Sequence, residues 1–211
     1  MTPLNIRKID PATPDQNLIV MAAKILTNGG LVVTPTETKY GILAWAEDLK
    51  AVKKIFELKK RSLDKATAVF AGSREEISRL GVENRISKKL AAAFLPGPLT
   101  LVLRNKSGYG PPISVNNKIG IRLSSSPVIS LLAGSVRGNL TATSANISGG
   151  KEASTIDDIS QVFGEAIDLY LDGGRLESPG STVVDCSGED YRILRSGVIA
   201  DNDIAKSLNK V

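Results

Sequence analysis

Short apolar runs alternate with amphipathic helical segments along most of the chain, and this alternation restricts the possible folds more than any other feature. Apolar side chains recur at helical spacing from Thr13 to Asn28, and the run Leu31-Val32-Val33 then indicates a buried strand. After a polar loop, Asp48 begins a second helical pattern. Helices interleaved with short strands predict a layered α/β fold.

The alternation continues to the end of the chain. We predict further helices at residues 73–81, 85–94, 127–133, 155–163 and 201–208, and strands at residues 68–71, 99–104, 119–123, 140–143, 167–171, 182–185 and 191–194. Late in the chain several strands follow one another without a helix, which favours a mixed sheet over a parallel one. The length of 211 residues suits one domain, residues 1–211.

Composition limits the classes of protein to which the chain can belong. Hydrophobic residues make up 42% and charged residues 23%, which is typical of a folded globular protein. The longest apolar runs fall far short of the roughly 20 residues that cross a bilayer, and the N-terminus has no apolar signal region. We therefore expect no membrane segment and a cytoplasmic location.

The chain has a single cysteine, Cys186, and no histidine. One thiol cannot form an intrachain disulfide, and the common zinc-ligand sets need more cysteine or histidine. We therefore predict no structural metal. Because Cys186 follows an apolar strand-like run, we interpret it as a half-buried structural cysteine rather than a nucleophile.

Lys and Arg exceed Asp and Glu by 27 to 22, which gives a formal net charge of +5. A nucleic acid, a nucleotide or another phosphate-bearing partner would suit this charge, and so would an ordinary soluble surface. The net charge by itself does not distinguish an anionic partner from an ordinary soluble surface. The positions of the polar residues along the chain are needed to choose between them.

Residues 34–41, with the sequence T-P-T-E-T-K-Y-G, follow a predicted strand. Ligands bind at the carboxyl ends of strands in open α/β sheets, so this run is a candidate site. An ordinary polar turn, whose hydroxyls bond their own backbone, is the simpler interpretation of the run taken alone.

Residues 58–65 place the cations Lys59, Lys60, Arg61 and Lys65 beyond a predicted helix. Lys and Arg together suit polyphosphate, whereas the alternative is a solvated basic helix end that complements the macrodipole. Residues 144–150 combine hydroxyl, amide and backbone donors, as a nucleotide-binding turn or an ordinary Asn-Gly turn would. Residues 179–185 bring hydroxyls to the mouth of a strand, and Arg122 and Arg195 each end an apolar strand.

The order and combination of these motifs are far more specific than any one of them. The chain carries in succession Pro35-Thr36-Glu37-Thr38-x-Tyr40-Gly41, Lys59-x-Arg61 with Lys65, Pro96-Gly97-Pro98-Leu99-Thr100, Ile121-Arg122, Ser144-Ala145-Asn146-x-Ser148-Gly149, Ser181-Thr182-Val183-Val184-Asp185 and Leu194-Arg195-x-Gly197. Over nearly its whole length it resembles the YrdC/TsaC family of threonylcarbamoyl-AMP synthases.

The resemblance implies a twisted open mixed sheet, flanked by helices, around a positively charged cavity, in the short single-domain form of the family. It also implies a nucleotidyltransferase that makes L-threonylcarbamoyl-AMP and pyrophosphate from L-threonine, bicarbonate or CO2, and ATP with its Mg²⁺. The product feeds the t6A modification of adenosine 37 in tRNA. Expected partners therefore include the downstream tRNA threonylcarbamoyltransferase machinery, and a contact with tRNA or double-stranded RNA is compatible with this function.

Carried over position by position, the resemblance assigns three sets of residues. Catalysis would use Lys59, Arg61 and Lys65, whose charges offset that of the transferring phosphoryl group and the leaving pyrophosphate. L-Threonine would contact Thr36, Thr38, Arg122, Ser144 and Ser181, with Thr34 as a further candidate. ATP would contact Lys59, Arg61, Asn146, Ser154 and Arg195.

The resemblance assigns no metal ligand, and we interpret Glu37 as a polar or metal-facing group rather than an essential base. Ser62, Ala66 and Ser124 stand where the family often has proline. The sequence therefore predicts the residues of these loops better than their conformation. Residues 105–117, with Gly108, Gly110, Pro111 and Pro112, have turn composition and predict a surface loop.

Two other functions are compatible with the same residues. A non-catalytic module could bind transfer or double-stranded RNA in the basic cavity, with strong salt dependence and no ATP chemistry. Related domains that make carbamoyl-adenylate for hydrogenase maturation are similar in sequence, but they usually sit in much longer multidomain chains.

Overall fold

The computed structural model describes residues 3–150 and 153–209. Its strands are β1 (Ile6–Lys8), β2 (Val32–Pro35), β3 (Tyr40–Leu43), β4 (Ala68–Phe70), β5 (Gly81–Val82), β6 (Leu99–Asn105), β7 (Ser114–Val115), β8 (Lys118–Arg122), β9 (Leu140–Ser144), β10 (Leu169–Asp172), β11 (Thr182–Asp185) and β12 (Arg192–Arg195). They form one sheet with the spatial order β1-β10-β2-β3-β9-β4-β8-β6-β11-β12, in which β5 pairs with β6 and β7 with β8.

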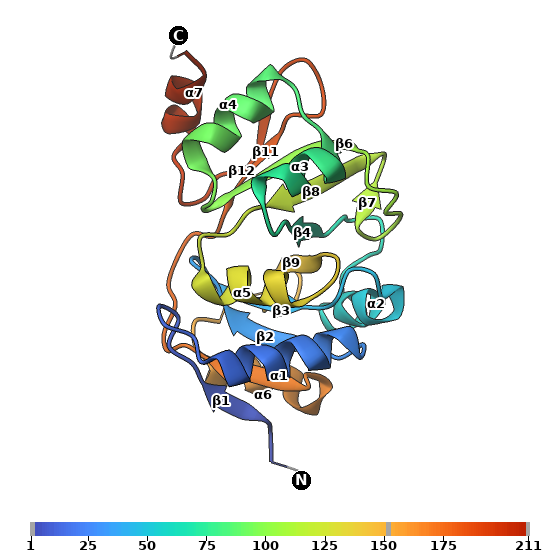
Figure 1. The fold of residues 1–211 in the computed structure, drawn as a ribbon, viewed down its shortest axis with the longest axis vertical. Coiled ribbons are helices and arrows are strands. Elements are labelled where there is room, and N and C mark those ends of the chain that lie inside the picture. Colours follow the sequence, from blue (N-terminus) through green and yellow to red (C-terminus); the bar gives the residue numbers. More distant parts are fainter. Residues whose placement is uncertain (1–2, 151–152, 210–211) are drawn as a thin grey trace.

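The sheet is mixed, as the sequence predicts. Strands β1, β10 and β2 run parallel, and so do the pairs β4–β8 and β6–β11. The remaining pairs are antiparallel, including β9 with β3 on one side and with β4 on the other. Figure 1 shows β9 and β4 across the middle of an elongated molecule, with the two termini at opposite ends.

Seven helices flank the sheet in the described part of the chain. They are α1 (Gln16–Thr27), α2 (Leu49–Leu58), α3 (Arg74–Leu80), α4 (Arg85–Phe94), α5 (Pro127–Ser135), α6 (Ile156–Phe163) and α7 (Asp201–Asn209), and a 3-10 turn, Gly164–Ala166, follows α6. Six helices begin with a side-chain cap that accepts a backbone N–H bond, at Asp15, Asp48, Ser73, Asn84, Ser126 and Thr155. The caps explain why most predicted helix starts agree with the observed ones. The start of α1 differs, because Asp15 caps it and the helix begins at Gln16 rather than directly after Thr13.

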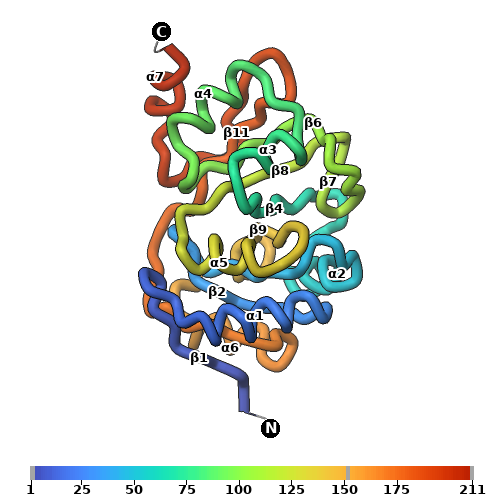
Figure 2. The backbone as a smooth tube through the Cα atoms, viewed as in Figure 1, coloured from blue at the N-terminus to red at the C-terminus, as the bar shows by residue number. Residues whose placement is uncertain are grey.

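Two groups of buried apolar side chains cover the sheet. The first joins α1 and α5 to the sheet through Ile19, Leu26, Val128, Leu132, Val32 and Leu169. The second joins α2, α3, α4, α6 and α7 to it through Phe56, Ile77, Leu90, Ile159 and Ile204. In Figure 2 the chain after β10 runs along one side of the molecule and returns to the other half at β11.

The sequence analysis missed strand β3, which it interpreted as part of a loop between residues 34 and 48. All four residues of β3 are buried. Gly41 interrupts the apolar pattern there, and it is needed because a Cβ at Gly41 would lie 3.3 Å from the carbonyl oxygen of Thr143 on β9. Strand β1 and the two-residue strands β5 and β7 were also missed, and β7 lies inside the loop predicted at residues 105–117.

Cys186 is 1% exposed, and burial raises the pKa of its thiol to about 12, with a smaller contribution from Asp185. Cys186 is therefore more deeply buried than the half-buried position predicted from the sequence, and its thiolate is disfavoured at neutral pH. None of the helices within residues 3–150 and 153–209 is long and apolar enough to span a bilayer.

We expect Leu132→Ala to lower the free energy of unfolding by about 2–5 kcal/mol, because it leaves a cavity beneath α5. Leu132 is 0% exposed, whereas its neighbour Leu131 is only partly buried. Leu131→Ala is therefore the matched control and should cost distinctly less in a chemical denaturation series. Equal losses for the two variants would contradict this packing.

Candidate functional site

A cavity of about 640 Å³ lies on one face of the sheet. Six strands line it with residues two positions apart, and such residues point to the same face of a strand. These are Ala68 and Phe70 of β4, Thr100 and Val102 of β6, Lys118, Gly120 and Arg122 of β8, Ala142 and Ser144 of β9, Val183 and Asp185 of β11, and Arg192 and Leu194 of β12. The volume is that of a typical small-molecule site. The site therefore extends along a sheet face, not only at strand ends as the sequence analysis expected.

Cations outnumber acids in the cavity wall. Seven lining residues are basic, namely Lys39, Lys59, Arg61, Lys118, Arg122, Arg192 and Arg195, whereas two, Asp64 and Asp185, are acidic. Such a concentration of one sign of charge in a concave surface attracts anions. The composition of the wall therefore fits an anionic ligand.

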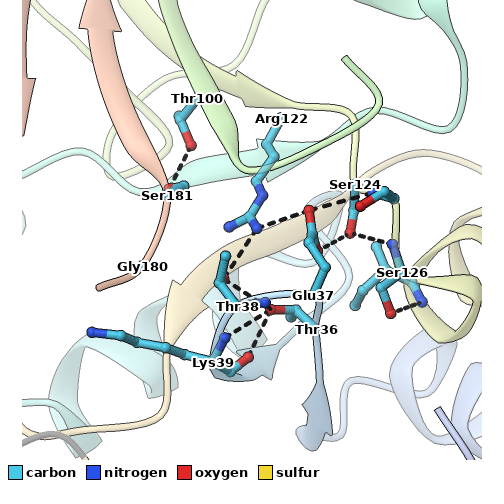
Figure 3. A network of polar contacts seen from close by, with 12 residues as sticks. Thr36, Glu37, Thr38, Lys39, Thr100, Arg122, Ser124, Ser126, Gly180 and Ser181 are labelled. Atoms are coloured by element: carbon cyan, nitrogen blue, oxygen red, sulfur yellow. Dashed lines mark hydrogen bonds and ion pairs between the residues drawn. The ribbon is translucent and has the colours of Figure 1, made fainter. Parts of the chain in front are cut away.

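The turn between β2 and β3 forms one wall, as Figure 3 shows. The Thr36 hydroxyl donates to the carbonyl of Lys39 at 2.7 Å and accepts from the amides of Thr38 and Lys39, each at 3.1 Å. Thr36 therefore uses its hydroxyl to close its own turn, as the simpler interpretation expected. The Thr38 hydroxyl instead lies 3.1 Å from a nitrogen of Arg122.

Arg122 ends β8, and the residue is 7% exposed. Its Nη2 donates to Thr38 Oγ1 at 3.1 Å and forms an ion pair with Glu37 Oε1 at 2.9 Å. The guanidinium also lies over the Phe70 ring, 5.8 Å from the ring centroid. Its buried Nε has no hydrogen-bond partner in the described part of the protein. Arg122 thus brings a buried, incompletely satisfied cation to the cavity wall.

Lys59 follows α2 and is 2% exposed. Its ammonium donates to the carbonyl oxygens of Ser144 and, at 2.7 Å, of Asn146, while its own carbonyl accepts from the amide of Ser148 at 2.9 Å. The Ser144 hydroxyl lies in turn against the Asn146 side chain. Lys59 therefore fixes the turn after β9 that the sequence analysis singled out.

Arg61 lies over the ring of Phe56, with 5.6 Å between the guanidinium carbon and the ring centroid. It donates to the carbonyl oxygens of Lys65 at 3.1 Å and Ala66 at 2.7 Å, so it shapes the loop that lacks the expected prolines. Burial, and then the positive charge of Arg195, lower the pKa of Arg61. Two guanidinium groups held this close favour an anion between them.

Ser181 and Arg195 also line the cavity. Arg195 donates to the Ser181 carbonyl at 2.9 and 3.1 Å and to its hydroxyl at 2.9 Å. The Ser181 hydroxyl also lies 3.0 Å from that of Thr100. The parallel pairing of β11 with β6 brings Ser181, which directly precedes β11, next to Thr100 of β6.

Nine of the residues predicted for the site line this one cavity, although they come from segments far apart in the chain: Thr36, Thr38, Lys59, Arg61, Arg122, Ser144, Asn146, Ser181 and Arg195. Lys65 and Ser154 are not among the lining residues. Lys65 is exposed, and its carbonyl accepts from Arg61. Ser154 accepts from the amide of Leu176 at 2.9 Å, and Thr34 is fully buried. The roles of all these residues stay predictions.

Lys118 and Arg192 line the cavity but lie outside every sequence motif, whereas Lys39 and Asp185 lie inside motifs without an assigned role. Lys118 and Asp185 form an ion pair of 2.8 Å. Burial by itself would raise the pKa of Asp185. The hydrogen bonds from Lys118 and Ser187 outweigh burial, and the pKa of Asp185 is lowered. The signal that could have found Lys118 is its spacing of four from Arg122, which puts both on one face of a strand.

Acidic residues are sparse at the cavity. Within residues 3–150 and 153–209, no group of three or more His, Cys, Asp or Glu side chains could hold a metal ion.

The chain is similar to known proteins over most of its length. A family profile named Sua5_yciO_yrdC and described as telomere recombination matches residues 24–197. A relative from Methanocaldococcus jannaschii is 35% identical over 184 residues, which are 87% of each chain. The threonylcarbamoyl-AMP synthase of Pyrococcus abyssi is 33% identical over 197 residues, which cover 92% of this chain but 58% of that enzyme.

The structural similarity is equally extensive. The crystal structure of P. abyssi Sua5 complexed with L-threonine matches with a TM-score of 0.89 and 31% identity, over 98% of this chain and 61% of that one. The chain thus spans most of the length of the M. jannaschii relative and about three fifths of the P. abyssi sequence and structure.

We expect Lys59→Met to lower the free energy of unfolding by about 1–3 kcal/mol, because it leaves two carbonyl oxygens of the turn after β9 without their donor. Faster hydrogen exchange of the Ser148 amide, measured by mass spectrometry, should accompany the loss. Lys60→Met is the control, since Lys60 is the exposed neighbour and its loss should cost less than about 0.5 kcal/mol. Unchanged exchange at Ser148 in Lys59→Met would contradict the anchoring role.

Proposed function

Because this chain belongs to the Sua5/YciO/YrdC family, we propose that it is a threonylcarbamoyl-AMP synthase, a nucleotidyltransferase that uses L-threonine and ATP. The observation that carries the proposal is the convergence of nine motif residues on one basic cavity. The relatives favour this function over a non-catalytic RNA-binding module, because several are named threonylcarbamoyl-AMP synthase and the structure of P. abyssi Sua5 was solved with L-threonine.

We propose that L-threonine binds at Arg122, with its carboxylate on the guanidinium. Planar forks of N–H donors bind carboxylates well, and Arg122 is buried with an unpartnered Nε. The residues Thr38, Ser144 and Ser181 line the same cavity, and their hydroxyls would supply further polar contacts. Thr36 supports this site by holding the turn, since its hydroxyl is already used by backbone groups.

The ATP phosphates are proposed to lie beside Arg61 and Arg195. Burial and then the charge of Arg195 lower the pKa of Arg61, so a polyphosphate between the two guanidinium groups would relieve their repulsion. Asn146, on the turn that Lys59 fixes, would contact the nucleotide. Mg²⁺ would enter with ATP as part of that substrate, and its ligands would be phosphate oxygens.

The proposed reaction has two steps. The threonine amine forms a C–N bond to the carbon of CO2, or of bicarbonate with loss of water, and gives up a proton to leave a carbamate. A carbamate oxygen then forms a bond to the α-phosphorus of ATP. The bond from that phosphorus to the bridging oxygen breaks, and pyrophosphate leaves with the electron pair.

The residues of the chain act here by position and charge. Arg122 would orient the amino acid, while Arg61 and Arg195 would hold the phosphates in line and offset the charge of the leaving group. Catalysis by positioning and electrostatics needs no protein nucleophile. Lys59 would act by holding the turn, and Lys65, which is exposed, would contribute at longer range.

The product is a reactive mixed anhydride, so we propose that a downstream tRNA threonylcarbamoyltransferase consumes it. A cytoplasmic location suits this role, because ATP, threonine and tRNA meet there. Direct contact with tRNA is a separate proposal, supported by the exposed lysines Lys50, Lys53, Lys54 and Lys60 on and beside α2.

The function is tested by pyrophosphate release from MgATP, with and without L-threonine and with and without bicarbonate. We expect release only with both, and a loss of at least about 100-fold in kcat/KM for Arg61→Ala, because phosphate charge is no longer offset. Arg79→Ala, which removes an exposed arginine on α3, is the control.

Other outcomes of this assay point elsewhere. Release that is independent of threonine would exclude the proposed substrate. No release under any condition, with salt-sensitive RNA binding retained, would favour the RNA-binding module.

A further inference from the structure

Glu37 occupies a position that the proposed reaction does not use. It sits between two threonines of the β2–β3 turn, yet it is not among the residues that line the cavity. Its side chain is 14% exposed and pairs with Arg122, which does line the cavity and is 8% exposed. Glu37 therefore lies behind Arg122 relative to a ligand, and any effect on the ligand passes through Arg122.

The chain holds the Glu37 carboxylate from the other side. The Ser124 hydroxyl donates to Oε2, and the Ser125 amide donates to Oε1 at 3.3 Å. The Ser124 hydroxyl also accepts from the Ser126 amide at 3.2 Å, just before α5 begins. Both carboxylate oxygens are thus fixed by the segment that links β8 to α5.

The fixed carboxylate in turn fixes the guanidinium. Arg122 Nη2 is held at 2.9 Å by Glu37 Oε1 and at 3.1 Å by Thr38 Oγ1. In Figure 3 the other terminal nitrogen of Arg122 points away from Glu37, towards the space beside Ser181 and Gly180. One terminal nitrogen of Arg122 is therefore bonded within the protein, and the other faces the cavity.

We propose that Glu37 is a positioning residue that orients Arg122 to receive the carboxylate of L-threonine, and that Ser124 holds Glu37 in place for this task. The inference rests on the proposed binding of threonine at Arg122. An arginine side chain has many rotamers, and a planar fork recognises a carboxylate only when it is aligned. Orientation before binding removes that ordering cost from the binding step.

The test uses steady-state pyrophosphate release with the full chain. Glu37→Gln keeps the size of the side chain and one carbonyl acceptor but removes the charge. We expect the KM for L-threonine to rise about ten-fold, the range typical of lost supporting contacts, with kcat and the KM for ATP within about two-fold. Ser124→Ala should shift the KM in the same direction by less, and Ser130→Ala, an exposed serine of α5, should not shift it.

Binding of a probe that lacks a carboxylate shows whether Glu37 acts on recognition of the threonine carboxylate. By calorimetry, Glu37→Gln should weaken L-threonine and leave the affinity for L-threoninol, which has a hydroxymethyl group instead, unchanged. The combination of Glu37→Gln with Arg122→Lys should cost less than the sum of the two single effects, because both act on one interaction. Thermal unfolding of each variant establishes that the comparison concerns folded protein.

The possible results separate a failure of the positioning role of Glu37 from a failure of the proposed threonine site. If Arg122→Lys leaves the KM for L-threonine unchanged, the proposed threonine site is wrong. If Arg122→Lys raises it and Glu37→Gln does not, the positioning role alone is wrong. A fall in kcat with both KM values unchanged, or strictly additive effects in the double variant, would also overturn the positioning role, because they indicate a structural contribution only.

Discussion

The antiparallel pairing of β9 with β3 on one edge and β4 on the other joins the two halves of the sheet. Gly41 lies opposite Ser144, and Phe70 lies opposite Leu140, so each half is tied to a different end of β9. This pairing brings the β2–β3 turn up to β8, where Arg122 stands. The turn that follows β9 then reaches Lys59 at the end of α2.

A cavity wall rich in cations is costly unless each cation is held in place. Several are held here by neutral oxygens, for example Arg61 by two loop carbonyls and Lys59 by the carbonyls of Ser144 and Asn146. Carbonyl oxygens orient a cation without cancelling its charge, so the wall keeps its attraction for anions. Arg122 and Lys118 differ because each has a carboxylate partner, Glu37 and Asp185.

The helices could be read from the sequence because their signals are local. Ser73, Asn84 and Ser126 cap helices at the predicted starts, and apolar side chains mark the buried face of each helix. Strand β3 could not be read because its assignment depends on β2 and β9, which lie on either side of it. Tyr40–Leu43 is short and contains glycine, so only these partners make it a strand.

The sequence by itself determined the fold class, most helix boundaries and the identity of nine residues that line the cavity, because these follow from local periodicity and from motifs kept in order. Only the tertiary structure decided which contacts each of those residues makes. Thr36 closes a turn while its neighbour Thr38 meets Arg122, and Lys59 anchors a loop. Likewise, Glu37 faces Arg122 and Ser124, which lie 85 and 87 residues further along the chain. Contacts at such separations are created by strand pairing and helix packing, which local sequence patterns do not encode.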